Sequence, residues 1–414
     1  MRKIMAVLDV GNDTTKLIVG EMIKNRLNVL DISSINTQGM KKSNIVEPDK
    51  LSICIQNLFK TASEKLGMNV TKTIVIIPSK NAEFTIGEGI IKINNENNVI
   101  NGSDISKVLI ESTSGIIQDN MELVSVTPTI FRLDNNQYSK DPKGSISTKL
   151  GVRSVIISSP KSIVYPILEI LERLNIDVVD IAFDAVGDYY TNKNLNTDNK
   201  VGAIVNIGNS KTTISIFNKG ILTNISNIEL GGENIDNDIS YIYKVPSTVS
   251  RKLKEEFALA SIRLASQNDT LEVVNKNGEK IRVNQYEVSN IISSRLKEIL
   301  GIVKKEINHL TKKELSYIIF SGGTTELQDF SIVLEEIFGK NAKIGCINEL
   351  GARNNKYSSA LGLIRWYNEL EKLKDKDYSI FTVDDQEDLS GIQKQGTISD
   401  NSIIGKVFGY FFDN

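Results

Sequence analysis

The chain has 414 residues, of which 40% are hydrophobic and 24% charged, and its formal net charge is −2. This length predicts more than one domain, and the near-neutral charge excludes a general attraction to nucleic acid. Two cysteines and one histidine exclude a disulfide framework, a histidine-based triad and a zinc cluster. No apolar run approaches the roughly 20 residues of a transmembrane helix, so we expect any membrane role to be peripheral.

The first stretch, residues 6–19, predicts a β-hairpin with a polar tip. Backbone N–H groups at such a tip can surround an anion. An acid at the strand end can hold a hydrated cation beside that anion. The tip therefore predicts a metal–phosphate site, with candidate residues Asp9, Gly11, Asn12, Thr14, Thr15 and Lys16.

The rest of the first half reads as part of a doubly wound domain. A third strand is expected over 27–35, an amphipathic helix over 48–66 with Gly67 as its C-cap, and a buried strand over 73–78. Residues 83–160 then form an insert. It is expected to hold strands near 84–87, 89–93, 121–133 and 153–158, and a helix near 103–114 capped at Ser103-Asp104.

After the insert, a helix over 161–174, a strand over 176–181 and a connecting helix from Phe183 are expected. A second hairpin over 203–216 then repeats the first without a gap, pairing Asp9 with Asn206 and Gly11 with Gly208. A repeat at this distance predicts two related halves rather than a solenoid. Two such hairpins facing each other would hold a nucleotide's phosphates; the alternative is two ordinary hairpins with glycine turns. The second tip offers Asn206, Gly208, Asn209, Ser210, Lys211 and Thr212.

The second half continues with a turn at Gly231, Gly232 and Glu233, where glycine lets the backbone approach a ligand. Helices are expected over 247–266, 287–308, 326–338 and 357–369. A hairpin turns at Asn277-Gly278. An apolar strand from Ile318 ends in a second glycine turn, formed by Gly322, Gly323 and Thr324.

Polar and acidic residues from 373 to 400 predict a disordered linker. Residues 401–414 then place an apolar stripe on one face of a helix. This pattern is typical of a helix lying in a membrane interface, and docking in a protein groove is the alternative. Lys406 is its only basic residue. The stripe consists of Ile403, Ile404, Val407, Phe408, Phe411 and Phe412.

The two hairpins and the later Gly-Gly turn resemble the actin/Hsp70/sugar-kinase ATPase superfamily. Within it, the chain resembles the FtsA family of bacterial cell-division proteins, through residues 141–144, 150–152, 231–235 and 357–363 and the apolar tail. The resemblance implies an α/β, actin-like, two-lobed fold of duplicated ribonuclease-H-like domains, with an FtsA-type inserted α/β subdomain and a C-terminal amphipathic helix. The implied parts are a first core subdomain (1–82, 161–190, 350–372), the insert (83–160), a second core subdomain (191–233, 311–349), an accessory subdomain (234–310), the linker (373–400) and the terminal helix (401–414).

The resemblance also implies that ATP and Mg²⁺ bind at the hairpins, with Asp9 holding the metal through water. Lys254 would contact the ribose, and the turn at 322–324 would pack against the adenosine. Asp184 would orient the attacking water, or simply cap its helix. Asn206 brings no negative charge toward the metal, so we expect hydrolysis to be slow or absent.

As partners, the resemblance implies other copies of the chain, membrane lipids, and the C-terminal peptide of FtsZ, bound through Arg295 and Lys297 on an accessory helix. No nucleic acid is expected. The expected function is a scaffold that tethers FtsZ to the inner face of the cytoplasmic membrane at the division site. The alternatives are a pilus-assembly adaptor of the same subfamily and a sugar-kinase-like phosphotransferase.

Overall fold

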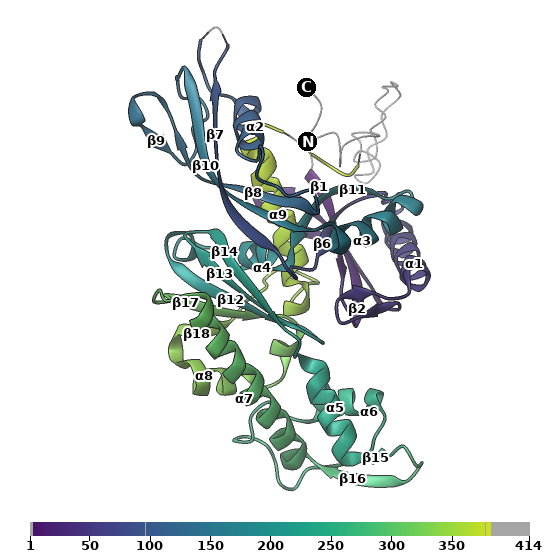
Figure 1. The fold of residues 1–414 in the computed structure, drawn as a ribbon. Coiled ribbons are helices and arrows are strands. Elements are labelled where there is room, and N and C mark those ends of the chain that lie inside the picture. The colour runs from purple at the N-terminus through teal and green to yellow at the C-terminus, as the bar shows by residue number, and fades with distance from the viewer. Residues whose placement is uncertain (1–2, 96, 377, 382–414) are drawn as a thin grey trace. The chain divides into compact units, whose positions relative to one another are not determined.

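The computed structural model describes residues 3–95, 97–376 and 378–381. It divides into two compact units. Unit one comprises residues 1–190, 349–352 and 359–414, and unit two comprises residues 191–348 and 353–358. Figure 1 labels most of the helices and strands of both. Among the described helices, none is both long and apolar enough to span a bilayer.

A five-stranded sheet forms the core of unit one, in the order β11-β6-β1-β2-β3. The first three strands along the chain pair antiparallel, and β6 and β11 extend the sheet in parallel beside β1. Most residues of β1 and β6 are buried, as expected for apolar runs covered on both faces. The strands are β1 (Lys3–Val10), β2 (Thr14–Ile23), β3 (Arg26–Asn36), β6 (Lys72–Ile77) and β11 (Asp177–Phe183), with a short β4–β5 ladder (Met40–Lys41, Asn44–Ile45).

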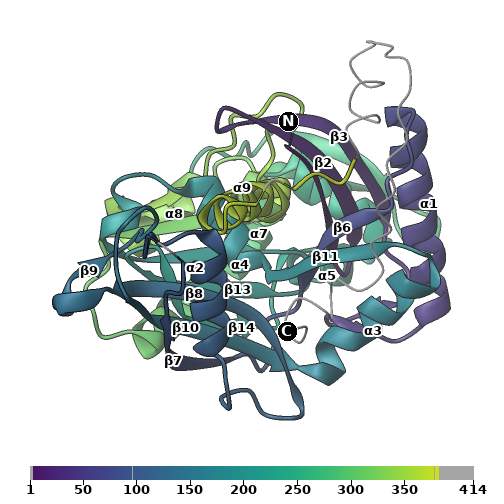
Figure 2. The same cartoon turned by 90° about the horizontal axis from the view of Figure 1, so that it is seen from above.

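Helices cover both faces of this sheet (Figures 1 and 2). The first, α1 (Pro48–Leu66), has the predicted bounds and ends at Gly67 in the left-handed conformation. It lies beside α3 (Lys161–Arg173) on one face. On the other face lies α9 (Ser358–Leu373), for which Gly20 of β2 leaves room.

The connecting helix α4 (Asp184–Asn192) crosses α9 at very close range. A Cβ atom built on Gly187 would lie 1.8 Å from the carbonyl oxygen of Ser359. The Ser359 hydroxyl donates a 3.1 Å hydrogen bond to the fully buried carboxylate of Asp188. Glycine at position 187 therefore sets the separation of the two helices.

The inserted subdomain is a four-stranded sheet, in the order β7-β10-β8-β9, with one helix packed on it. The two strands expected before Ile93 are a single strand, because Gly87 and Gly89 stay in the ladder and make room for the helix backbone. The helix is capped by Asn101 and Asp104 in a capping box, not at Ser103. The elements are β7 (Glu83–Lys92), α2 (Gly102–Glu111), β8 (Met121–Arg132), β9 (Tyr138–Ser139) and β10 (Lys149–Pro160).

The end of α9 is joined to this subdomain by a polar contact that we call the α2–α9 junction, made by Gly102, Lys143 and Asp375. The Asp375 carboxylate accepts hydrogen bonds from the Lys143 ammonium and the Gly102 N–H, both at 2.8 Å. The two bonds lower the pKa of Asp375, that from Lys143 most strongly. Lys143 also donates to the Lys372 carbonyl at 2.8 Å. The Asp-Pro-Lys-Gly segment at 141–144 thus has a structural role.

Beyond the junction, the chain returns to the core sheet of unit one. The Ile380 N–H donates a 2.8 Å hydrogen bond to the Ile4 carbonyl, and both Ile380 and Phe381 are buried. The expected linker from 373 therefore begins with packed residues. The expected remainder of the linker and the helix at 401–414 lie outside the described residues.

Asp180 of β11 gives unit one a predicted pH dependence. It lies at a shift in the register between β11 and β6, and burial raises its pKa to about 7, against an opposing effect of Lys374. A carboxyl with a raised pKa favours the folded state when protonated, so stability should fall as pH rises from about 4 through 7. Partial solvent contact moderates the effect, and we expect a loss of about 1–2 kcal/mol between pH 5 and pH 8. Urea denaturation should show this loss in wild type but not in Asp180→Asn; parallel pH profiles would contradict it.

Unit two repeats the core pattern with the sheet order β14-β13-β12-β17-β18. Its first three strands again pair antiparallel, and two parallel strands follow. The predicted duplication is therefore confirmed. The strands are β12 (Val201–Ile207), β13 (Thr212–Asn218), β14 (Ile221–Ile228), β17 (Tyr317–Ser321) and β18 (Ala342–Ile344).

The remaining elements of unit two follow the sequence with two corrections. The helix expected over 247–266 ends early, in a π-helical turn at Leu253–Phe257, because the Ala260 N–H bonds the Gln328 carbonyl instead of continuing a helix. The helix expected from Glu326 starts at Phe330, after Asp329 in the left-handed conformation. The elements are α5 (Gly232–Tyr243), α6 (Ser247–Lys252), α7 (Gln285–Leu310), α8 (Phe330–Phe338) and the predicted hairpin β15–β16 (Thr270–Val274, Lys280–Asn284).

Candidate functional site

The tip of the β1–β2 hairpin places the first candidate residues together in unit one. The Gly11 N–H bonds the Thr14 carbonyl at 3.2 Å and closes the turn. Behind the turn, Asp9 and Lys16 are partners in the antiparallel register, and their side chains form a 2.5 Å ion pair. Both side chains are largely buried, so the tip carries a cation and an anion held in fixed positions.

The two threonines of this tip have different surroundings. Thr15 is fully buried, and its hydroxyl shares a 2.8 Å hydrogen bond with Thr37. Thr14 stays partly exposed beside Asp13. Asn12 accepts a 2.8 Å hydrogen bond from the Ser43 N–H. Of the two hydroxyls, that of Thr14 is therefore the one available to a ligand at the tip.

The β12–β13 hairpin of unit two has the same construction. The Gly208 N–H bonds the Lys211 carbonyl at 2.9 Å, which matches the Gly11–Thr14 bond. Thr212, the counterpart of Thr15, is also fully buried, and it donates to the Leu230 carbonyl at 2.7 Å. Asn209 and Ser210 remain partly exposed at the tip. The ungapped sequence repeat is thus a repeat of backbone bonds and of a buried threonine.

The Gly231-Gly232 turn packs directly on the second hairpin. The Gly232 N–H bonds the Gly208 carbonyl at 3.0 Å, and the Glu233 N–H bonds the Asn209 carbonyl at 2.7 Å. A Cβ atom on Gly231 would lie 2.5 Å from the Asn209 oxygen. Glycine is therefore needed here for close approach to the hairpin, and these two N–H groups already have protein acceptors.

The turn after β17 joins the same cluster. Gly322 has φ +92°, and a Cβ atom there would lie 2.4 Å from the side-chain oxygen of Asn206. The Thr324 hydroxyl donates to the Gly208 carbonyl at 3.0 Å. Gly323 is exposed beside them. Unit two thus brings Asn206 and the second hairpin together with the predicted adenosine-side turn.

Lys254 reaches this cluster from the π-helical turn, and it has a partner that sequence reasoning missed. Its ammonium lies 2.8 Å from the Asp236 carboxylate and donates to the Gly232 carbonyl at 3.2 Å. The Lys254 and Asp236 side chains are each 5% exposed. The available sequence signal was an acid one helical turn after a Gly-Gly pair.

Asp184 lies at the first position of α4 in unit one, partly exposed, and accepts a 2.9 Å hydrogen bond from the Ala185 N–H. This hydrogen bond lies at the start of the helix and is compatible with helix capping, and it leaves the carboxylate partly exposed. Both expected roles of Asp184, helix capping and orientation of a water, therefore stay predictions. In the described part of the chain, no group of three or more acidic, histidine or cysteine side chains could hold a metal ion by itself.

The two candidate partner residues on α7 are both engaged in ion pairs. Arg295 contacts both oxygens of Asp238 at 2.6 and 2.8 Å, and Glu298 at 2.6 Å. The hydrogen bond to Asp238 is the main cause that raises the pKa of Arg295. Lys297 lies 3.0 Å from Glu336. An acidic peptide binding here would have to exchange with these carboxylates.

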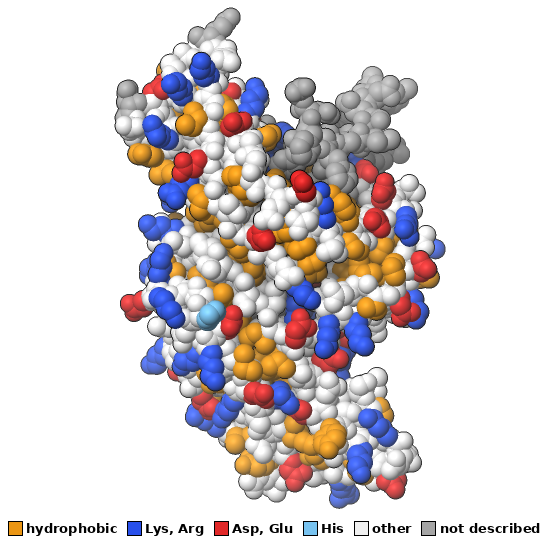
Figure 3. All heavy atoms as spheres, viewed as in Figure 1, with side chains coloured by type: hydrophobic (Ala, Val, Ile, Leu, Met, Phe, Trp, Pro, Cys, Tyr) orange, Lys and Arg blue, Asp and Glu red, His pale blue; other side chains and the backbone are white. Residues whose placement is uncertain are grey.

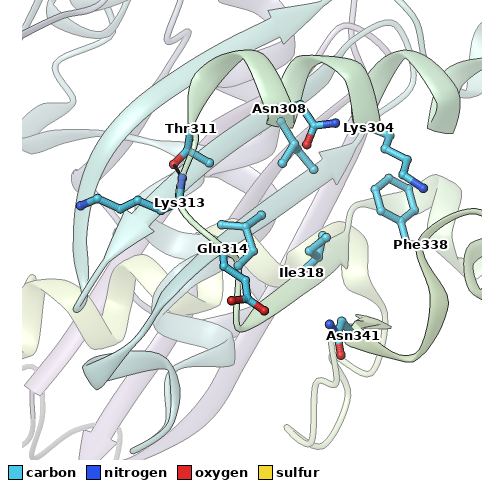
Figure 4. A pocket seen from close by; sticks show the side chains of 10 residues that line it. Lys304, Asn308, Thr311, Lys313, Glu314, Ile318, Phe338 and Asn341 are labelled. Carbon is cyan, nitrogen blue, oxygen red and sulfur yellow. Dashed lines mark hydrogen bonds between the residues drawn. The ribbon is translucent and has the colours of Figure 1, made fainter.

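A separate pocket of about 250 Å³ lies at the C-terminal end of α7 (Figure 4). The ammonium of Lys304 lies 5.8 Å from the centre of the Phe338 ring and donates to the Ile337 carbonyl at 2.6 Å. None of the predicted site residues lines this pocket. In the face of the molecule that Figure 3 shows, basic and acidic side chains are interspersed.

The fold matches solved structures of low sequence identity. MreB5 of Spiroplasma citri bound to ADP matches with a TM-score of 0.55 and 11% identity, covering 90% of this chain and 99% of that one. A PilM-PilN type IV pilus biogenesis complex matches with a TM-score of 0.58 and 12% identity, covering 87% of this chain and 97% of that one. At these identities the matches establish the fold alone. Together with the duplicated sheets and hairpins, they define an actin-like ATPase fold.

Family models narrow this class. The model described as "Cell division protein FtsA" matches residues 203–362, and that described as "SHS2 domain inserted in FTSA" matches residues 80–158. The FtsA of Bacillus subtilis is 28% identical over 361 residues, covering 87% of this chain and 82% of that protein. The FtsA of Enterococcus hirae is 25% identical, covering 88% and 83%. The chain belongs to the FtsA family of cell-division proteins.

Proposed function

We propose that this chain is an ATP-binding, actin-like scaffold that self-associates and links FtsZ to the inner face of the cytoplasmic membrane at the division site. The observation that carries the proposal is the repeated hairpin, closed by the same backbone bond at Gly11 and at Gly208, in a chain that also has the FtsA-type insert.

The contacts within each unit support nucleotide binding. In unit one, Lys16 and Thr14 would meet phosphate oxygens, and Asp9 would hold Mg²⁺ through water. One carboxylate suffices for this, because Mg²⁺ keeps several waters and takes its other ligands from phosphates. In unit two, the tip of the second hairpin and the exposed Gly323 would offer further polar and backbone contacts to a nucleotide. When bound, Mg²⁺ would supply charge neutralisation at the phosphates.

Asn206 supports the proposal that ATP hydrolysis is slow or absent. In unit two its side-chain oxygen lies against Gly322, where it has a packing role. An amide takes no proton and brings no charge to the metal, and phosphoryl transfer depends on both positioning and charge stabilisation. The nucleotide would therefore act mainly as a ligand that shifts the conformational equilibrium and favours assembly, with slow or no hydrolysis.

Two partners are proposed, the C-terminal peptide of FtsZ and membrane lipids, and the first requires Arg295 and Lys297 to exchange their present ion-pair partners. The C-terminal peptide of FtsZ would bind through Arg295 and Lys297 by exchanging with Asp238 and Glu336. The stripe from Ile403 to Phe412, outside the described residues, would bind membrane lipids. The absence of nucleic acid among the partners stays a prediction.

Equilibrium dialysis with ATP tests nucleotide binding. Wild type should bind ATP at millimolar concentration, and Mg²⁺ should tighten binding. Asp9→Ala should lose most of this Mg²⁺-dependent gain, about tenfold in affinity, because the carboxylate proposed to hold the hydrated ion is removed. In EDTA, both proteins should bind ATP with similar affinity. Absence of ATP binding in wild type would refute the nucleotide proposal, and an unchanged Mg²⁺ effect in Asp9→Ala would refute the role of Asp9.

A further inference from the structure

The buried ion pair between Asp236 and Lys254 lies beneath the Gly231-Gly232 turn of unit two. Each side chain is 5% exposed, and the charged atoms are 2.8 Å apart. Arg251, which is 38% exposed, approaches the same carboxylate at 3.5 Å from the solvent side. A charged pair is costly to bury, so its placement under a glycine turn calls for a role beyond simple packing.

Four chain segments meet at this pair. Lys254 donates to the Gly232 carbonyl, and the Gly232 N–H in turn bonds the Gly208 carbonyl. That same carbonyl accepts the Thr324 hydroxyl. Hydrogen bonds thus connect the Lys254 ammonium, through Gly232, to the second hairpin and to the turn after β17. All of these residues belong to unit two.

We propose that Asp236 is a positioning residue for nucleotide binding. It holds the Lys254 ammonium against the Gly232 carbonyl, and this fixes the backbone of the Gly231-Gly232 turn and of the hairpin tip at Gly208. The inference rests on the proposed function, because the positioned groups are those that would contact ATP. Lys254 then acts from within the protein, since its charge is buried and directed at protein oxygens.

The pair can be tested by removing its charges singly and together. Asp236→Asn removes the nearest counter-charge of the buried Lys254 ammonium and leaves only Glu255 at 3.9 Å, and Lys254→Met leaves the buried Asp236 carboxylate with only Arg251 at 3.5 Å. Each single variant should bind Mg²⁺-ATP roughly tenfold more weakly than wild type, the equivalent of one well-placed hydrogen bond. The double variant Asp236→Asn/Lys254→Met leaves no unpaired charge. It should recover stability in urea, but it should bind ATP as weakly as Asp236→Asn, because the Gly232 carbonyl still lacks its ammonium donor.

A second measurement needs no nucleotide. Hydrogen exchange at the Gly232 and Glu233 amides should be faster in Asp236→Asn than in wild type, because the turn loses its support. Arg251→Gln is the matched control, since it removes the exposed cation from the same carboxylate, and it should change ATP affinity less than threefold.

Four outcomes decide the question. If wild type binds no ATP, the proposed function fails, and the exchange experiment still tests whether Asp236 supports the turn. If wild type and Asp236→Asn bind ATP equally and exchange alike, the positioning role is refuted. If Asp236→Asn binds ATP more weakly but its Gly232 and Glu233 amides exchange as in wild type, the pair does not act through the turn and the positioning role is again refuted. Weakened ATP binding and faster exchange in Asp236→Asn, with ATP binding still weak in the double variant, support it.

Discussion

Deletion of residues 401–414 is expected to abolish recovery of the protein with lipid vesicles in a flotation assay. The full-length protein should float with the vesicles, and ATP binding should be the same in both proteins. The reason is the apolar stripe at Ile403, Ile404, Val407, Phe408, Phe411 and Phe412. Each buried CH₂ contributes about 0.8 kcal/mol, so removing the stripe removes several kcal/mol of membrane affinity.

Two point variants separate burial from charge in this segment. Phe408→Glu puts a charge in the middle of the apolar face and should release the protein almost as fully as the deletion. Lys406→Ala removes the only basic residue of the segment and should matter little. Raised salt should also weaken binding only modestly, because anionic lipids add little to so weakly basic a segment. Equal flotation of full-length and truncated protein would remove the membrane proposal and favour docking on a protein groove.

Gly187→Val should destabilise the protein by about 3 kcal/mol or more, because a collision with backbone cannot be relieved by rotating a side chain. In α4, the new Cβ atom would lie 1.8 Å from the Ser359 carbonyl oxygen and 2.8 Å from the Ser359 Cα. The helices must then separate, which also breaks the hydrogen bond from Ser359 to the buried Asp188. Urea denaturation measures the loss directly.

Gly301→Ala is the matched control, because Gly301 lies within a helix, α7, with no atom within 4 Å of its added Cβ. Alanine there should stabilise the protein by about 1 kcal/mol through helix propensity alone. A Gly187→Val protein as stable as wild type would show that α4 and α9 can move apart at little cost.

The sequence predicted the structure best where the spacing of apolar residues matches the residues that are buried in the fold. The apolar spacing of α1, with Pro48 at its start and Gly67 after its end, predicted both helix bounds. The repeat of the hairpins predicted two equivalent sheets, and their closing bonds at Gly11 and Gly208 follow from glycine at matching positions.

Contacts between segments far apart in the chain were beyond the reach of local pattern. Residues 258–266 have helical spacing, yet Ala260 bonds Gln328 and leaves the helix. Asp236 follows the Gly231-Gly232 pair by one helical turn, but only the fold brings Lys254 to it. For the same reason, the pairing of Arg295 with Asp238 and of Lys297 with Glu336 could not be foreseen, because these carboxylates come from α5 and α8.

The α2–α9 junction and the packed residues after it also determine how unit one bears a mechanical load. A pull on the chain beyond Phe381 first meets the hydrogen bond between Ile380 and Ile4 and the burial of the last two described side chains. If these yield, the load passes to Asp375, which is held by Lys143 and by the first turn of α2. Force on the C-terminal segment is therefore resisted in series, first at the start of the central strand β1 and then at the inserted subdomain.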